Sequence, residues 1–203
     1  MSGSTFDTSA SVARQPKRER GRQRVEALLD AASSVFLERG MEVATMTEIA
    51  ARAGASIGSL YQFFPNKAVL ALALRERFVA RALGVFGELE NCGRRLDAEE
   101  LAVALIAYIH TIERDRAVML ALGDVRSEHD EERVRTRTVL MQGLANVLCA
   151  HAEGLKPERA MHCARLILYL LRLVSELPHE SQGEAIEQEL RGLLQTYLVG
   201  LGV

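Results

Sequence analysis

The sequence predicts an all-α protein in which short helices near the N-terminus are followed by long ones. Three observations predict this fold class. Apolar residues recur at helical spacing along most of the 203-residue chain, signals that start or stop helices separate these stretches, and no stretch alternates in the manner of a β-strand. Apolar residues make up 48% of the chain, which suffices for a sizeable core.

The first helix is expected over residues 20–39. Its apolar side chains share one face, and Gly40 follows it as a C-cap. Residues 1–15 are small and polar, and we expect them to form a disordered tail. The apolar face of the helix consists of Val25, Leu28, Leu29, Ala32 and Phe36.

Two short helices are predicted next. Thr45 and Glu48 have the spacing of a capping box, which starts a helix that Gly54 ends. After a tight turn, Ser56 can cap a second helix over residues 57–63. Two short helices joined in this way predict a helix-turn-helix, a motif that places its second helix in the major groove of DNA. The buried positions expected to hold the two helices near a right angle are Ile49, Ala55, Leu60 and Phe63.

Long helices are predicted for the rest of the chain. Asn66 can cap a helix that starts at Lys67 and links the two domains that we expect, residues 16–66 and residues 67–203. The last two helices are apolar on several sides, so either a second subunit or a larger core of the same chain must cover them, and we favour the second subunit. The predicted helices cover residues 67–90, 97–113, 116–122, 130–152, 157–177 and 181–201.

The residue content argues against several classes of protein. The three cysteines are widely spaced, which favours a cytoplasmic protein with reduced thiols over a disulfide framework or a CxxC site. The longest apolar run, residues 101–109, is far shorter than the ~18 residues of a membrane span, and the N-terminus lacks a secretory segment. The histidines show no metal-ligand spacing, and no nucleophile, phosphate-loop or dinucleotide motif appears. We therefore expect no membrane contact, metal, cofactor or enzyme activity.

Charge is distributed unevenly along the chain, whose formal net charge is −2. Residues 1–67 carry nine Lys and Arg against seven Asp and Glu, and the remaining residues carry 16 against 20. Within residues 14–24, six basic residues oppose only Glu19. This basic arm indicates attraction to DNA phosphates, the alternative being a solubilising tail.

A longer pattern extends over the helix-turn-helix. The run from Thr45 to Lys67 reads TMTEIAARAGASIGSLYQFFPNK, and the preceding helix ends in VFLERG at residues 35–40. Both closely resemble the DNA-binding domain of the TetR/AcrR family of transcriptional regulators, and the resemblance covers about residues 22–70. It implies an all-α homodimer that binds palindromic operators and carries a divergent C-terminal ligand-binding domain.

The resemblance also implies which side chains meet DNA. Groove-facing positions include Ile57 and Gln62, and the general chemistry agrees, because glutamine can pair with adenine and isoleucine can meet a thymine methyl. Positions that usually hold phosphates include Thr45 and Lys67, and a hydroxyl or an ammonium group at a helix start suits a phosphate. The full set of expected DNA contacts is Thr45, Thr47, Ser56, Ile57, Gly58, Ser59, Tyr61, Gln62 and Lys67, with Arg18, Arg20 and Arg22 from the basic arm.

The predicted recognition helix departs from the family pattern because it has no charged side chain. Ile57 stands where the family often has a polar or basic residue, and Phe63 stands where it frequently has His or Tyr. Guanine reading by arginine is therefore not available from this helix. We expect an operator read through thymine methyls and DNA shape, with the basic arm supplying non-specific attraction and entering the adjacent minor groove.

The function that the sequence predicts is sequence-specific regulation of transcription. We expect a repressor that a small-molecule effector releases from its operator by shifting the population of dimer conformations. The resemblance implies that residues 157–177 and 181–201 form the dimer interface. The alternative is a helical protein that binds small molecules and has no sequence-specific DNA function. The expected lining of the effector pocket is Phe86, Tyr108, Met119, Leu144, Leu166 and Tyr169, any of which could instead be ordinary core.

Overall fold

The computed structural model describes residues 17–122, 131–174 and 181–201 of the chain. Every regular element within these ranges is a helix, which confirms the predicted all-α fold. The predicted tail over residues 1–15 lies outside the described residues. The elements are α1 (Lys17–Val43), α2 (Met46–Arg52), α3 (Ile57–Phe63), α4 (Lys67–Cys92), a 3-10 turn (Gly93–Arg95), α5 (Ala98–Ala121), α6 (Glu131–His151), α7 (Pro157–Val174) and α8 (Ser181–Val199).

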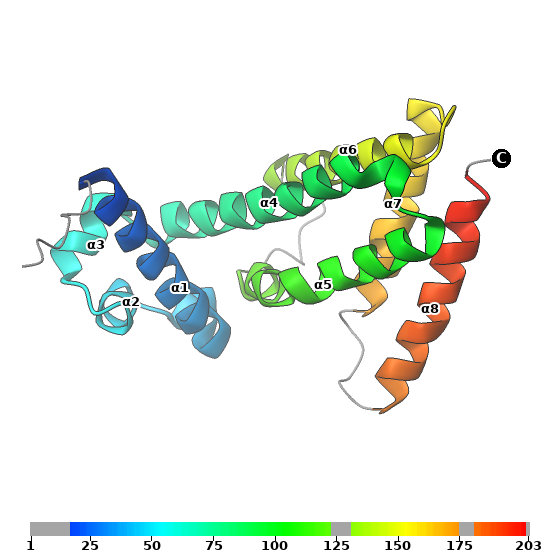
Figure 1. Ribbon diagram of the computed structural model, residues 1–203. Coiled ribbons are helices and arrows are strands. Elements are labelled where there is room, and N and C mark those ends of the chain that lie inside the picture. Colours follow the sequence, from blue (N-terminus) through cyan, green and yellow to red (C-terminus); the bar gives the residue numbers. More distant parts are fainter. Residues whose placement is uncertain (1–16, 123–130, 175–180, 202–203) are drawn as a thin grey trace, which may run out of the picture.

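The helices form a small head and a larger body (Figure 1). We call α1, α2 and α3 the head; α4 leads away from it and enters the body, which also contains α5 to α8. In the body, α6 packs against α4 and α7, and α8 packs along α5. The near end of α5 also packs on α1, so the head touches the body through α5 as well as through α4.

Side-chain caps fix where the head and α4 begin their helices. The capping box of α2 is present in both directions, because the Thr45 hydroxyl accepts from the Glu48 amide and the Glu48 carboxylate accepts from the Thr45 amide. Ser56 caps α3 and Asn66 caps α4 in the simpler way, by accepting a backbone N–H three residues on. These predicted helix starts are confirmed.

Two predicted helix boundaries are wrong. Gly40 has φ 74° and ψ 160°, which breaks the regular helix as expected, but one further turn follows it as far as Val43. The helices predicted over residues 97–113 and 116–122 are a single helix, α5. Asp115, which lies between the two predicted helices, is buried against Arg81 of α4 and so fits inside a continuous helix.

The body has a tightly packed centre between α4, α5 and α6. The rings of Phe86 and Tyr108 lie 4.8 Å apart and tilted by 40°. Gly143 of α6 lies so close to Leu83 and Phe86 of α4 that an added Cβ would approach them to 2.8 and 2.9 Å. Val134, near the start of α6, is 55% exposed, although its spacing from the apolar residues further along α6 predicts a buried position.

Candidate nucleic-acid interface

A glycine turn sets the angle between α2 and α3. Gly54 has φ 59°, a conformation that side chains rarely adopt. Its N–H donates to the Ala51 carbonyl at 3.1 Å, and the Ala55 N–H donates to the Ala50 carbonyl at 2.9 Å, which together close α2 with a Schellman motif. This closure ends α2, and α3 begins at Ile57 and packs against α2.

One face of α3 is held inside the head and the opposite face is open. Leu60 is fully buried together with Ile49 of α2, as predicted. On the open face, Ile57 is 41% exposed and Tyr61 is 49% exposed. The remaining expected contacts in α3 are also accessible: Gly58 and Gln62 are exposed, and Ser59 is half-buried.

The prediction that Phe63 is buried is wrong. Its side chain is 39% exposed, and Phe64 takes the inner position instead. The two rings contact each other at 6.5 Å between centroids. Since α3 ends at Phe63, Phe64 is no longer bound by the helical register and can turn inward. The exposed surface of α3 is therefore more aromatic than the sequence indicated.

The hydroxyl groups at the helix starts already have partners inside the chain. The Thr45 hydroxyl donates to the Glu48 carboxylate at 2.9 Å, and Ser56 accepts from the Ser59 amide at 3.2 Å. These hydrogen bonds from the side chain and the backbone of Thr45 lower the pKa of Glu48. Thr45 and Thr47 are both exposed at this end of α2.

Lys67 joins the start of α4 to the end of α1. Its Nζ donates to the carbonyls of Met41 and Glu42 at 2.8 and 2.9 Å. Carbonyls at the end of a helix have no partner within the helix, and a cation there is favourable. The phosphate contact expected of Lys67 would thus use its third N–H.

The basic arm belongs to the first turns of α1. Arg20 and Arg22 are exposed, and Arg22 forms an ion pair with Glu19 at 2.6 Å. Arg18 is within the helix, but its side chain lies outside the described part of the chain. The described part of the arm therefore lies at the N-terminal end of α1, in the head (Figure 1).

The sequence analysis missed the ion pair that fixes α2 to α1. Both terminal nitrogens of Arg52 meet the carboxylate of Glu38, at 2.6 and 2.7 Å. This hydrogen bonding lowers the pKa of Glu38. The two residues are 14 positions apart, so no local spacing could have paired them.

The residues expected to line an effector pocket fall into two groups. Phe86, Tyr108, Met119 and Leu144 are buried in the body, and burial raises the pKa of the Tyr108 hydroxyl. Leu166 and Tyr169 lie on the open face of α7, with 44% and 48% of their surface exposed. The structure therefore buries the first four, with Phe86 and Tyr108 in direct contact, and leaves the last two at the surface.

The comparisons with known proteins agree with this arrangement. The profile of the family described as "Bacterial regulatory proteins, tetR family" matches residues 28–74, which include all of α2, the glycine turn and α3. Residues 28–74 thus form a DNA-binding domain of the TetR family. Among solved structures, a transcriptional regulator from Rhodococcus sp. Rha1 is similar over 88% of this chain and 98% of that one, with 26% identity and a TM-score of 0.66.

Two curated relatives match about half of the length of this chain. The HTH-type transcriptional activator FasR of Mycolicibacterium smegmatis is 41% identical over 103 residues, which is 50% of this chain and 44% of the relative. The HTH-type transcriptional repressor BepR of Brucella suis is 35% identical over 100 residues, 46% of each protein. The chain thus matches less than half the length of either relative.

A helix that crosses a bilayer is both long and apolar. Within the described ranges, no helix of this chain meets both conditions.

Proposed function

We propose that this protein is a sequence-specific DNA-binding regulator of transcription, and not an enzyme, that reads DNA with the open face of α3. The observation that carries the proposal is the two-sided character of α3, whose Leu60 is fully buried while Ile57 and Tyr61 stand out into solvent. A helix held in this way can enter a major groove without rearrangement. Of the two relatives, FasR is named as a transcriptional activator and BepR as a transcriptional repressor.

The chemistry of α3 supports an operator rich in A·T pairs at the contacted positions. Gln62 can form two hydrogen bonds with adenine, and Ile57 can pack on a thymine methyl. Phe63, which is exposed as well, enlarges the apolar surface available for such methyl groups. We propose that Thr45, Thr47, Ser56, Gly58, Ser59, Tyr61 and Lys67 make the remaining contacts, with Arg18, Arg20 and Arg22 on the backbone or in the minor groove.

A binding assay with Gln62→Ala tests this proposal. Fluorescence anisotropy with the DNA upstream of the gene and with a scrambled duplex measures sequence preference at several salt concentrations. Loss of a bidentate base contact should weaken operator binding by about 1–3 kcal/mol, which is roughly 5- to 150-fold. The matched control is Gln142→Ala on α6, an exposed glutamine in the body, which should bind like the wild type. Absence of sequence preference at every salt concentration would favour the small-molecule-binding alternative.

We further propose that the chain forms a homodimer through α7 and α8. Large apolar side chains on these helices are exposed in the single chain, among them Leu166, Tyr169, Ile186 and Leu193 at 44 to 52%. Several large exposed apolar side chains on two neighbouring helices are typical of an interface, and a two-fold dimer matches a palindromic operator whose half-sites lie ~34–36 Å apart. Light scattering should find Leu193→Glu monomeric and the control Val134→Glu, equally exposed on α6, dimeric.

We propose that the protein represses transcription and that a small-molecule effector, bound in the body, releases it from the operator. We also propose that it resides in the cytoplasm. The buried aromatic pair Phe86 and Tyr108 supports this site, because it joins α4, which leads to the head, to α5. A compound screen by thermal shift, followed by anisotropy on the operator, tests it. A compound that raises the melting temperature should also lower operator affinity. If every stabilising compound leaves operator affinity unchanged, the effector proposal is wrong.

A further inference from the structure

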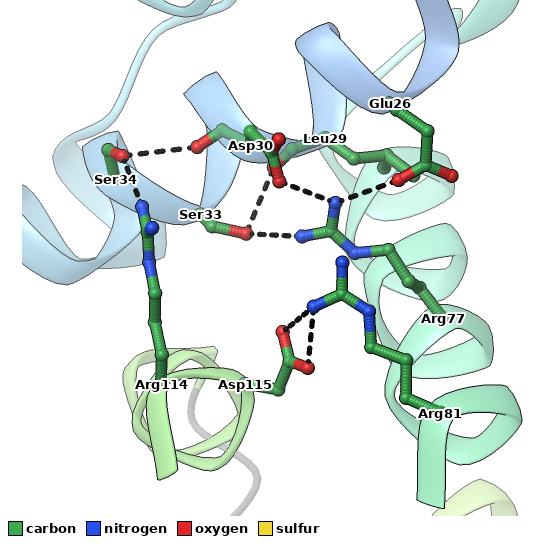
Figure 2. Close-up of polar contacts among 9 residues, drawn as sticks. All are labelled: Glu26, Leu29, Asp30, Ser33, Ser34, Arg77, Arg81, Arg114 and Asp115. Carbon is green, nitrogen blue, oxygen red and sulfur yellow. Dashed lines mark hydrogen bonds and ion pairs between the residues drawn. The ribbon is translucent and has the colours of Figure 1, made fainter. Parts of the chain in front are cut away.

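Arg77 of α4 holds three groups of α1 at once (Figure 2). Its Nη1 lies 2.8 Å from Asp30 and 3.3 Å from Glu26, and its Nη2 donates to the Ser33 hydroxyl at 3.0 Å. The Arg77 side chain is only 9% exposed. Ser33 is buried as well, and it donates its own proton to the Leu29 carbonyl at 2.9 Å. The position of α1 on α4 is therefore defined by directional bonds from one guanidinium group.

One turn further along α4, Arg81 contacts α5 instead of α1. Its Nη1 lies 2.9 and 3.2 Å from the two carboxylate oxygens of Asp115 on α5. The next contact closes a triangle, because Arg114 of α5 donates to the Ser34 hydroxyl of α1 at 2.9 Å. Figure 2 shows the three arginines converging between the three helices. We call these eight residues the junction: Glu26, Asp30, Ser33, Ser34, Arg77, Arg81, Arg114 and Asp115.

The junction differs in kind from the apolar contacts around it. Apolar side chains can slide past one another at little cost because their attraction has no direction, whereas hydrogen bonds between charged groups weaken steeply with distance and angle. The three arginines face three carboxylates, so the group is balanced in charge. It also spans sequence separations from 34 to 80 residues, so it ties parts of the chain that local structure does not connect.

The junction is the place where the head meets the body. On the head side it grips only α1, and α1 carries α2 through the Arg52–Glu38 ion pair. On the body side it uses both α4 and α5. A rotation of α1 relative to the body must break the contacts of Arg77 and Arg114 together, and it would carry α3 with it.

We propose that the junction positions the recognition helix relative to the body and thereby sets the half-site spacing that the dimer accepts. This inference rests on the proposed function. It assigns Arg77 and Arg114 as positioning residues that touch no DNA and act through the orientation of α1. It also means that α5 acts on the orientation of the head directly, through the contact of Arg114 with Ser34, and not only through α4.

A spin-label distance measurement tests the positioning without DNA. The labels are placed at Arg24→Cys on α1 and Gln142→Cys on α6, both exposed, in a chain whose native cysteines are replaced and which is diluted with unlabelled protein. We expect Arg77→Met and Arg114→Met to broaden or shift the distance distribution. Ser34→Ala removes only the hydroxyl that accepts from Arg114, so the protein should still fold. We expect it to broaden the distance distribution as well. The control Arg52→Met, which removes an ion pair inside the head, should match the wild type.

Operators whose half-site spacing is changed by one base pair test the consequence. The wild type should prefer one spacing, and Arg77→Met and Arg114→Met should reduce this preference by roughly fivefold or more, the lower end of typical coupling between sites. Unchanged distance distributions in all junction variants overturn the proposal. Changed distances with an unchanged spacing preference overturn the link to the operator. Should no DNA be bound with sequence preference, the proposed function fails, while the distances still decide whether the junction positions the head.

Discussion

Arg81 and Asp115 form an ion pair whose two partners are unequally buried. The distance from Arg81 Nη1 to the nearer carboxylate oxygen is 2.9 Å. The side chain of Asp115 is 9% exposed, whereas that of Arg81 is 51% exposed. The carboxylate thus depends on the arginine for its solvation, but the arginine can turn to water.

This inequality predicts different effects for the two halves of the pair. Arg81→Met leaves a buried carboxylate without its cation, which should lower the free energy of unfolding by about 2–4 kcal/mol. Asp115→Asn removes the buried charge and leaves a half-exposed arginine that water can solvate, so it should cost less than about 1 kcal/mol. Urea denaturation measures both values. Arg22→Met, in an exposed ion pair with Glu19, is the control and should change little; equal losses for Arg81→Met and Asp115→Asn would refute the argument.

The contact between α4 and α6 depends on a missing side chain at Gly143. An alanine there would place its Cβ 2.8 Å from Leu83 and 2.9 Å from Phe86, and the Phe86 ring is fixed by Tyr108. Overpacking should outweigh the helix propensity gained, so Gly143→Ala should lower stability by about 1–2 kcal/mol. Gly84 lies on α4, and a Cβ added there would meet no atom within 4 Å. Gly84→Ala should therefore raise stability by about 0.5–1 kcal/mol. A stabilised Gly143→Ala protein would show that α4 and α6 separate easily.

The sequence could predict features that depend on neighbours along the chain. The caps at Thr45 and Ser56 depend on a hydroxyl and an amide three residues away, and both were predicted correctly. The junction could not be predicted, because the partner of Arg81 is 34 residues away and an arginine on a helix ordinarily indicates a solvent-facing position. The same contact explains why α5 is continuous through Asp115. The choice between Phe63 and Phe64 as the buried ring depends on where α3 ends, which the spacing of adjacent aromatics does not determine.

The capping box of α2 should make the stability of the head sensitive to acid. Hydrogen bonds from Thr45 lower the pKa of Glu48 in the folded protein, so the folded state favours the ionised carboxylate. Its contribution is full above the unfolded pKa of about 4.3 and is lost as the pH falls through the folded pKa. Glu48→Gln keeps a capping side chain but does not ionise. In urea titrations between neutral and acid pH, the gap between wild type and Glu48→Gln should therefore close as the pH falls.

The control for this acid sensitivity is Glu88→Gln, an exposed carboxylate on α4 outside the head. Its urea midpoints should run parallel to those of the wild type over the same pH range. A gap between wild type and Glu48→Gln that stays constant down to the acid limit would mean that the charge of Glu48 adds nothing to its role as a cap.

Lys67 has a structural role and a proposed role in binding phosphate, and one substitution separates them. Its Nζ donates to the carbonyls of Met41 and Glu42, so Lys67→Met should lower the free energy of unfolding by about 1 kcal/mol. If the third N–H meets a phosphate, the slope of log affinity against log salt should also fall by about 0.9, the value for one neutralised phosphate on duplex DNA. Lys156→Met, at an exposed position before α7, should leave both quantities unchanged. A stability loss with an unchanged salt slope would assign Lys67 to the joint between α1 and α4 alone, and the phosphate attraction of the head would then have to come from the arginines of α1.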